Sequence, residues 1–387
     1  IPRIAEVWNT RREEVYSSSE SILKALQRVS QGREGGPELT ESILDRAYEE
    51  LSTRFDEDNG GFAAAPKFPS AHNLLFLLRY WSRTGQPRAL EMVEKTLSEM
   101  RRGGIFDHLG YGFHRYSTDA RWRVPHFEKM LYDQAMLALT YTETYQATGK
   151  EFYADTTREI LSYVLRDLRS REGGFASAED ADSEGEEGKY YTWSYGELAS
   201  LLSTAELSEL LELYDLQEEG NYREEATGER PRTNILYLKP GGYVAGMSEN
   251  RRTRVLEQRA GSIRPLKDDN ILTSWNGLMI DALARAGGVL GEPSYLEAAR
   301  DAQSFIWKQL RTPEGRLLHR YREGQAGIPA YATDYAYLIW GQIELYEATF
   351  ESTYLRQAEQ LMAFFIEDFW DEQGGGGFFL TADEADE

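Results

Sequence analysis

Apolar residues recur at three- and four-residue intervals along most of the chain, and this spacing predicts amphipathic helices. The clearest stripe, within residues 126–148, consists of Phe127, Met130, Leu131, Ala135, Ala138, Tyr141, Thr142 and Tyr145. Similar stripes predict further helices at 40–55, 71–85, 88–101, 151–169, 195–214, 271–290, 294–311, 333–350 and 352–369. The short gaps between them predict helices that come in pairs joined by short turns.

A glycine-rich return follows several of these pairs. It recurs at 58–62, 102–106, 172–175, 314–317 and 374–379. Glycine supplies the left-handed conformation that ends a helix, and the apolar residue after it turns the chain back onto the core. The repeat predicts an all-α fold, either an α/α toroid or a plain helical solenoid, and the long aromatic-rich returns favour the toroid. The polar residues 216–262 interrupt the repeat and predict an insertion or a short strand pair around Ile235–Leu238.

Charge and composition exclude several classes of partner. The chain has 387 residues and a net charge of −22, from 65 acidic and 43 basic residues, which argues against a nucleic-acid partner. No apolar run is long enough to span a membrane, and residues 1–30 lack the features of a signal peptide, so we expect a cytoplasmic protein without a membrane partner. The absence of cysteine excludes disulfides, thiolate ligands and a cysteine nucleophile. The chain begins at Ile1, without Met, and we expect it to be a piece of a longer protein.

Aromatic residues are abundant, with 24 Tyr, 16 Phe and 8 Trp. Tyr and Trp combine a large apolar ring with a polar group and suit a wet cleft that stacks flat ligands such as sugar rings. The alternative is that most of these rings pack between helices.

Residues 103–134 are the strongest candidate site, because His108, His114 and His126 fall within nineteen positions. Pro125 fits the first turn of a helix, and on such a helix His126 and Asp133 lie two turns apart on one side. An imidazole beside a carboxylate is suited to proton transfer at neutral pH. The alternative is that His126 only supports the loop through hydrogen bonds. The remaining candidates of this segment are Arg115, Trp122 and Glu128.

An acidic segment, residues 177–193, follows the third return. Its carboxylates have three interpretations: an acid and base pair for a glycosidic bond, a degenerate calcium loop, or a solvated acidic loop. Tyr191 stands where a calcium loop needs its bidentate Glu, which argues against the second. Residues 184–187 fit the third, whereas Asp180 and Asp182 lie between aromatic residues and are candidate site residues.

Two further segments place polar and aromatic residues at helix starts. Trp275 and Asn276 open the apolar helix around residues 271–290, and capping alone does not explain them. His319 and Asp334 occupy the equivalent place in the next repeat, so in a toroid they point toward the same mouth. The lone His72 is better explained as structural. Because P-loop, dinucleotide, zincin and nucleophile-elbow motifs are absent, we expect neither a cofactor nor a bound metal.

Several motifs carry a resemblance to a known family: Pro66-Lys67-Phe68-Pro69, Pro125 to Asp133 (PHFEKMLYD), Ala178 to Ser183 and Leu272 to Leu278 (LTSWNGL). With these, the chain closely resembles the helical part of the thioredoxin-fused, spermatogenesis-associated and YyaL-like proteins. The resemblance implies an (α/α)6 toroid of the six-hairpin glycosidase type, related to N-acylglucosamine 2-epimerases, over residues 37–387. Residues 1–36 are then a helical linker after a thioredoxin-like domain that is absent here, and further helices would follow the chain's end.

Two functional hypotheses follow. The first is a carbohydrate-active enzyme, a sugar epimerase or a glycoside hydrolase, with a sugar-like ligand at the toroid mouth. His126 is its acid/base and Asp180 or Asp182 the carboxylate partner, whereas an epimerase would pair His126 with His319. The substrate-binding set is His108, His114, Arg115, Trp122, Glu128, Asp133, Trp275, Asn276 and Asp334, with the two tryptophans as stacking platforms. The second hypothesis is a non-catalytic ligand-binding or protein-docking toroid that serves the thioredoxin-like module.

Overall fold

A computed structural model of the chain describes residues 2–30, 40–223, 232–240, 247–372 and 376–382. The chain divides into two compact units, Ile1–Ala47 and Tyr48–Glu387. The first contains α1 (Pro2–Thr10) and α2 (Arg12–Ser30), where Trp8 packs against Tyr16 and beneath Arg12. The predicted linker, 1–36, falls within this unit. Helix α3 (Ser42–Arg54) crosses from the first unit into the second.

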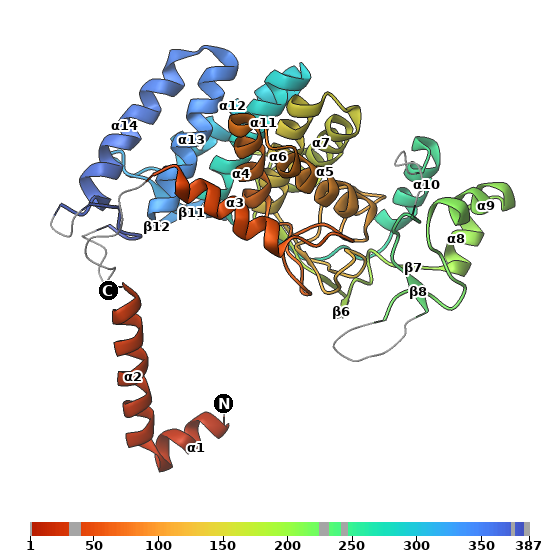
Figure 1. The fold of residues 1–387 in the computed structure, drawn as a ribbon, viewed down its shortest axis with the longest axis horizontal. Coiled ribbons are helices and arrows are strands. Elements are labelled where there is room, and N and C mark those ends of the chain that lie inside the picture. Colours follow the sequence, from red (N-terminus) through yellow and green to blue (C-terminus); the bar gives the residue numbers. More distant parts are fainter. Residues whose placement is uncertain (1, 31–39, 224–231, 241–246, 373–375, 383–387) are drawn as a thin grey trace. The chain divides into compact units, whose positions relative to one another are not determined.

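Four helical hairpins form the second unit (Figure 1). They are α4 (Ala71–Thr84) with α5 (Pro87–Arg102), α6 (Leu131–Thr148) with α7 (Glu151–Tyr163), α11 (Thr273–Leu290) with α12 (Pro293–Gln309), and α13 (Ala332–Thr349) with α14 (Ser352–Phe369). A short π-helical turn, η1 (Val164–Leu168), extends α7. The first helices of the hairpins pack side by side in the order α4, α6, α11, α13 and form the inner layer.

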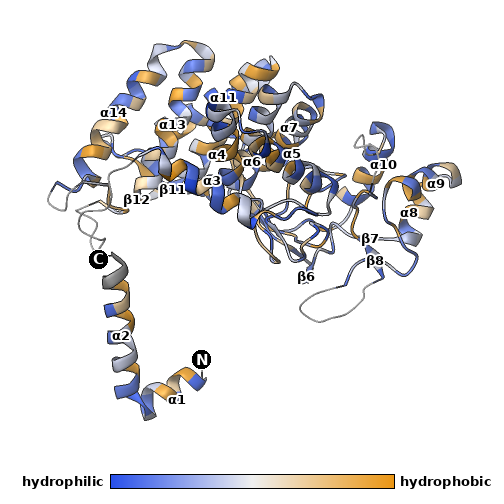
Figure 2. Ribbon diagram, viewed as in Figure 1, coloured by the Kyte–Doolittle hydropathy of each residue, from blue (hydrophilic) through white to orange (hydrophobic). Residues whose placement is uncertain are grey.

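Each hairpin turns within two residues, because the residue after the first helix adopts the left-handed conformation. Gly85, Gly149 and Gly291 do so in three hairpins, and Phe350 does so in the fourth. Glycine also brings α11 and α13 close together. A Cβ on Gly277 would lie 2.6 Å from the Leu338 nitrogen. The outer helices α12 and α14 bury apolar side chains, among them Ile306 of α12 and Leu361 of α14. Hydrophobic and hydrophilic residues alternate along α14 (Figure 2).

Short strands link the segments at the amino-terminal ends of the inner helices, which we call the mouth. One sheet joins β3 (Lys129–Met130), β4 (Ala178–Glu179) and β9 (Lys267–Asp268). A second joins β10 (Ile271–Leu272), β11 (Leu318–Arg322) and β12 (Gln325–Pro329), and β1 (Tyr116–Ser117) pairs with β2 (Pro125–His126). Since β3 runs directly into α6 and β10 into α11, these pairings fix how each inner helix begins.

The helix predicted from residue 126 begins at Leu131 instead. Residues 125–126 and 129–130 are extended because they pair with other strands, and Met130 still has strand dihedrals at φ −100° and ψ 139°. The predicted helical face shared by His126 and Asp133 is therefore wrong, as is the placement of Pro125 in the first helical turn.

A separate helical cluster lies between α7 and α11. It contains α8 (Tyr195–Leu201), α9 (Thr204–Leu213) and α10 (Glu249–Ala260), packed around an apolar core that includes Leu198, Leu210 and Val255. The single helix predicted at 195–214 is two helices, because Ser203 and Glu206 form a capping box that starts α9. Strand β8 (Thr233–Asn234) pairs with β7 (Trp193–Ser194), and Leu238 bridges Tyr214. The inserted structure thus begins earlier than residue 216.

Among the helices of the described residues, none is long and apolar enough to cross a membrane.

Candidate functional site at the toroid mouth

His126 lies on β2 between two carboxylates. Its Nδ1 is 2.7 Å from Oε1 of Glu187 and its Nε2 is 3.4 Å from Oε2 of Glu128. The hydrogen bond with Glu187 raises the pKa of His126, and the charge of Glu128 acts in the same direction. The Tyr116 ring stacks on the imidazole at a centroid distance of 5.0 Å. The site therefore holds a partly exposed imidazole whose charged form is favoured by the two carboxylates.

The second group centres on Asp133, in the first turn of α6. Burial raises the pKa of Asp133 well above its usual range, in the same direction as the charge of Glu128 and against that of Arg115. Its Oδ2 atom is buried and receives no hydrogen bond from the described residues. Arg115 donates from Nη1 to Oε2 of Glu128 at 2.8 Å. Burial thus favours the neutral form of Asp133, whereas the nearby Glu128 is held in an ion pair with Arg115.

Two pairs of aromatic rings lie among the residues of the mouth. Trp275, near the start of α11, contacts Tyr132 with ring centroids 4.9 Å apart, and both side chains are partly exposed. Phe68, which is 49% exposed, packs against Tyr116 at 4.8 Å. Exposed aromatic faces beside hydrogen-bonding groups are typical of sites that stack sugar rings.

His319 and Asp334 form a third pair at the start of α13. His319 Nδ1 donates to Oδ2 of Asp334 at 2.8 Å, and the Asp334 carboxylate also accepts from the backbone nitrogens of Ser274 and Tyr331. Asp334 is fully buried, whereas the His319 side chain is 22% exposed. Asp334 therefore orients His319 and joins the starts of α11 and α13, next to Trp275.

Four of the residues expected to bind substrate lie in the core. His108 bonds the Gly103 carbonyl, and burial lowers its pKa to about 3. His114 is 1% exposed and donates to the Phe127 carbonyl; burial lowers its pKa well below the usual range. Trp122 is buried and donates to the Asn59 carbonyl. The structure gives these three residues and Asn276 a structural position, without a surface for substrate.

Asn276 supports the return before β4. Its side chain accepts from the Phe175 nitrogen at 2.8 Å and donates to the Phe175 and Leu272 carbonyls at 3.0 and 2.9 Å. Asn276 is fully buried, whereas its neighbour Trp275 is partly exposed. The two side chains differ because successive residues of a helix point about 100° apart. The sequence predicts that Asn276 contacts substrate together with Trp275, but it has no exposed surface with which to do so.

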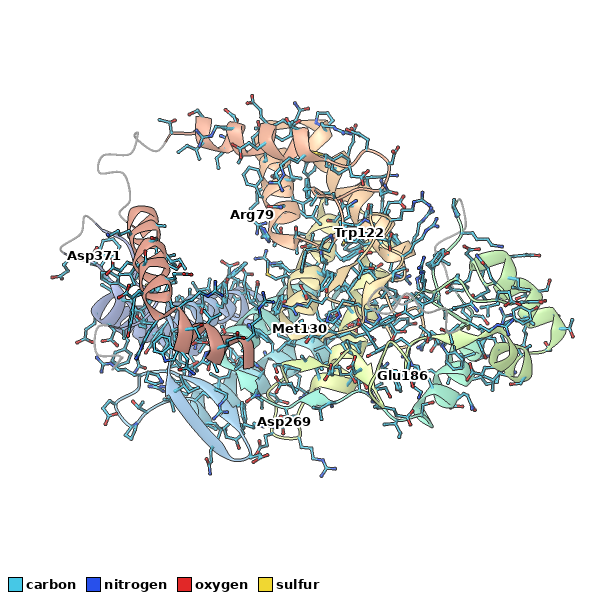
Figure 3. The ribbon with its side chains drawn as sticks, turned by 90° about the horizontal axis from the view of Figure 1, so that it is seen from below. Arg79, Trp122, Met130, Glu186, Asp269 and Asp371 are labelled. Atoms are coloured by element: carbon cyan, nitrogen blue, oxygen red, sulfur yellow. The ribbon has the colours of Figure 1, made fainter. Side chains whose placement is uncertain are left out.

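Asp180 and Asp182 do not contact His126. Both are exposed, and Asp180 bonds the backbone nitrogens of Ala181 and Asp182. The partner of His126 is Glu187, which the sequence placed in a solvated loop. Strands β5 (Asp182–Ser183) and β6 (Glu186–Glu187) form a hairpin that carries Glu187 to the mouth, while Glu186 remains exposed. Figure 3 labels Glu186 on this hairpin and Met130 on the adjoining strand.

A buried ionic cluster lies among the connecting segments behind the mouth. Both guanidinium Nη atoms of Arg259 donate to Asp107 at 2.9 Å, and Lys129 donates to the same carboxylate at 2.8 Å. Although burial acts in the opposite direction, Arg259 and Lys129 hold the pKa of Asp107 well below its usual range. None of the three side chains is more than 5% exposed, so this cluster holds the loops together and offers no surface to a ligand.

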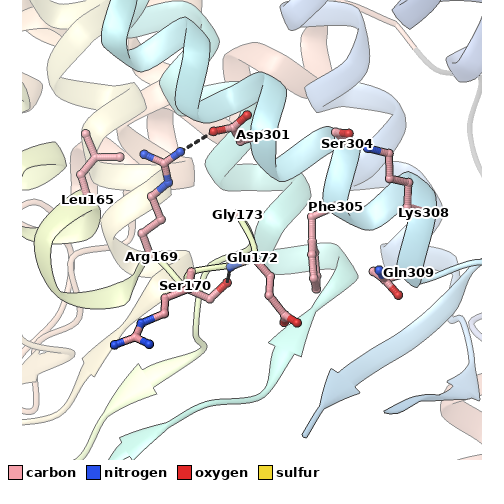
Figure 4. Close-up of a pocket in the computed structure, with 11 residues that line it drawn as sticks. Leu165, Arg169, Ser170, Glu172, Gly173, Asp301, Ser304, Phe305, Lys308 and Gln309 are labelled. Carbon is pink, nitrogen blue, oxygen red and sulfur yellow. Dashed lines mark hydrogen bonds and ion pairs between the residues drawn. The ribbon is translucent and has the colours of Figure 1, made fainter. Parts of the chain in front are cut away.

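No group of three or more His, Cys, Asp or Glu side chains within the described ranges is arranged to hold a metal ion. A cavity of about 600 Å³ lies between the return after α7 and the last turns of α12 (Figure 4). There Arg169 is paired with Asp301 of α12, and Lys308 lies farther along the same helix. The mouth joins a carboxyl group of raised pKa, a histidine held between two carboxylates and partly exposed aromatic rings.

Comparison with known proteins identifies relatives of this chain. It is 36% identical to spermatogenesis-associated protein 20 from Homo sapiens, over 98% of this chain and 54% of that protein. The chain belongs to the spermatogenesis-associated protein 20 family. It spans about half the length of the curated relatives it matches in this family. A scan against protein-family models gave no match.

Two solved structures with a similar fold are described as glycoside hydrolases. The family 76 α-mannanase BT2949 from Bacteroides thetaiotaomicron matches with a TM-score of 0.53 and 12% identity, over 88% of this chain and 72% of that one. A family 105 glycoside hydrolase from C. acetobutylicum matches with a TM-score of 0.51 and 11% identity, over 86% and 73%. These likenesses establish the fold, and they confirm the predicted all-α toroid of the six-hairpin glycosidase type.

Proposed function

We propose that the mouth of the toroid binds a sugar-like ligand and that the chain is the catalytic part of a glycoside hydrolase-like enzyme, with Asp133 as the general acid. The observation that carries this proposal is the Asp133 carboxyl group, whose pKa is raised by burial and whose Oδ2 has no protein partner among the described residues. A carboxyl group that stays protonated near neutral pH is what protonation of a glycosidic oxygen requires.

Glu128 supplies the second carboxyl group of this mechanism. It is 24% exposed and is held by Arg115 on one side and near His126 on the other. A carboxylate in that position activates a water molecule or attacks the anomeric carbon directly, depending on its separation from the acid. His126, held through Nδ1 by Glu187, offers its Nε2 to a hydroxyl group of the ligand.

In this proposal the aromatic rings bind and position the sugar. Tyr132, which contacts Trp275, precedes Asp133 in the chain, and Tyr116, which contacts Phe68, stacks on His126. A pyranose ring stacks on one of these pairs with its polar edge toward Asp133. Two solved proteins with this fold are described as an α-mannanase and a glycoside hydrolase, which agrees with a carbohydrate ligand.

A sugar epimerase is the second candidate, favoured by one observation. His126 and His319 are both partly exposed and both donate Nδ1 to a carboxylate, Glu187 and Asp334 respectively. Two such histidines would remove a proton from a sugar carbon and return it to the opposite face. The raised pKa of His126 suits the returning acid, which leaves His319 as the base.

A binding test comes first. Thermal shift and calorimetry with monosaccharides, disaccharides and uronic acids would compare the wild type with Asp133→Asn and Trp275→Ala. Asp180→Asn is the matched control, because Asp180 is an exposed carboxylate outside the mouth. We expect one sugar class to bind saturably, with binding lost in Trp275→Ala and kept in the control.

Turnover then separates the chemistries. Hydrolysis releases a new reducing end, and we expect Asp133→Asn to lower kcat by about 10²–10⁴ with little change in KM. Epimerisation instead incorporates solvent deuterium at a sugar carbon and depends on His319. If no sugar binds while every variant stays folded, the catalytic proposal fails. The chain would then be a docking toroid, and a thioredoxin-like domain of the longer protein would be the partner to test.

A further inference from the structure

We propose that a small basic cavity beside the end of α5 is a binding site for a phosphate- or sulfate-type oxyanion, separate from the mouth. The cavity has a volume of about 130 Å³. Its charged lining consists of Arg102, Arg121, Arg123, Lys239 and Glu99. A cavity of this size has room for one tetrahedral oxyanion.

The local charge is opposite to that of the protein. Four cationic side chains and one carboxylate line the cavity, although the whole chain carries 65 acidic and 43 basic residues. The single carboxylate, Glu99, already accepts from Lys95 at 3.2 Å. Two other carboxylates lie nearby with partners of their own: Asp119 accepts from the backbone nitrogen of Arg123, and Asp215 accepts from the Tyr237 hydroxyl.

The backbone brings these cations together. Arg121 and Arg123 flank Trp122, whose ring is buried in the core and whose backbone has a φ of 63°. Figure 3 labels Trp122 within the densely packed part of the unit. The segment lies directly on the end of α5, where a Cβ on Gly103 would be 2.2 Å from the Trp122 carbonyl oxygen. Only glycine permits this approach, which places the two arginines next to Arg102.

Two guanidinium groups in the cavity are free to bind. The side chains of Arg121 and Arg123 make no ion pair or hydrogen bond with any residue in the described part of the chain. The Arg123 guanidinium lies over the Tyr237 ring at 4.9 Å, which fixes its plane. Lys239 donates one hydrogen bond to the Leu211 carbonyl at 2.6 Å and keeps two N–H groups for a ligand. Planar guanidinium groups match the oxygens of a phosphate or sulfate group.

The helix dipole does not account for this arrangement. The carboxyl-terminal end of α5 favours a cation such as Arg102 in its last turn. Arg121, Arg123 and Lys239 come from other segments, and none of the three forms an ion pair with a carboxylate of the described residues. Their convergence in one concavity therefore indicates an anionic ligand.

Calorimetric titration with inorganic phosphate, and separately with inorganic sulfate, tests the site at constant ionic strength set by chloride. The test variant is Arg121→Gln/Arg123→Gln, whose side chains hold no structural contact beyond the Tyr237 ring. The matched control is Arg171→Gln/Lys308→Gln, which removes two cations from the cavity of Figure 4. Circular dichroism melts establish that both variants fold.

We expect saturable binding of one equivalent, weakened at least about tenfold in the test variant and unchanged in the control. Stronger binding of one anion than of the other identifies the group that the site prefers. Absence of saturable binding, or equal weakening in the two variants, would overturn the proposal. Because no sugar takes part, the result does not depend on the proposed function of the mouth.

Discussion

The Nδ1 atom of His126 and the Oε1 atom of Glu187 are 2.7 Å apart, although 61 positions separate the two residues in the chain. This contact joins the loop before α6 to the β5–β6 hairpin. It also gives the two groups opposite pKa shifts, because the same hydrogen bond raises the pKa of His126 and lowers that of Glu187.

Replacing Glu187 by Gln tests this pair through pH. A raised histidine pKa stabilises the fold fully below the unfolded value of 6.5, and the effect is lost as the pH rises through the folded pKa. The lowered Glu187 pKa stabilises above 4.5 and is lost as the pH falls through its folded value. We therefore expect E187Q to lower the free energy of unfolding most between about pH 4.5 and 6.5. The loss should be about 1 kcal/mol, because both groups are partly exposed. Urea unfolding across pH measures it.

The histidine resonances give an independent measurement of the same pair. In NMR titrations we expect the pKa of His126 to fall in Glu187→Gln and to stay unchanged in Asp180→Asn. An unchanged His126 pKa in both variants would contradict the contact.

Asp133→Asn should gain stability relative to the wild type as the pH rises from 4 to 8. The wild-type carboxyl group must either hold a proton or ionise while buried, and both cost free energy once the pH exceeds its unfolded pKa of 3.8. Asparagine has the same shape and no charge to bury. Thermal melts at the two pH values measure the difference, and a variant that loses stability with rising pH would show that Asp133 is not destabilised in the fold.

Trp275 and Asn276 should separate ligand binding from stability. Asn276→Ala leaves the Phe175 and Leu272 backbone groups unpaired in the core and should cost about 3 kcal/mol in the free energy of unfolding. Trp275→Ala removes a partly exposed ring and should cost less, while it abolishes sugar binding. Denaturant unfolding measures the stability of both variants, and calorimetry measures their sugar binding. If the two variants were equally stable and lost binding to a similar extent, the separate roles of Trp275 and Asn276 would be contradicted.

The sequence predicts the helices of this fold well and the site less completely, for a physical reason. Helical periodicity is local, so the stripes at 71–85 and 352–369 give α4 and α14 almost to the residue. The start of α6 depends on pairing of Lys129 with Glu179, which no local pattern records. Glu187 reaches His126 through a hairpin whose own sequence resembles a solvated loop. Composition does not show which of three neighbouring histidines is exposed, because burial of His108 and His114 depends on the packing around them.

Phe350 is the exception among the four hairpin turns, and replacing it should stabilise the protein. It adopts a φ of 57° where the other hairpins have glycine, and its side chain is 82% exposed, with one distant ring contact to Tyr346 at 6.4 Å. A left-handed backbone costs a residue with a Cβ about 1 kcal/mol, and little apolar burial offsets this cost here. We expect Phe350→Gly to stabilise by about 1 kcal/mol in urea unfolding. Gly291→Ala, at the equivalent turn with open space around its Cβ, is the control and should destabilise by a similar amount. A destabilised Phe350→Gly would mean that the ring holds α13 and α14 in place, so Phe350→Ala, which removes the ring and keeps the strain, distinguishes the two causes.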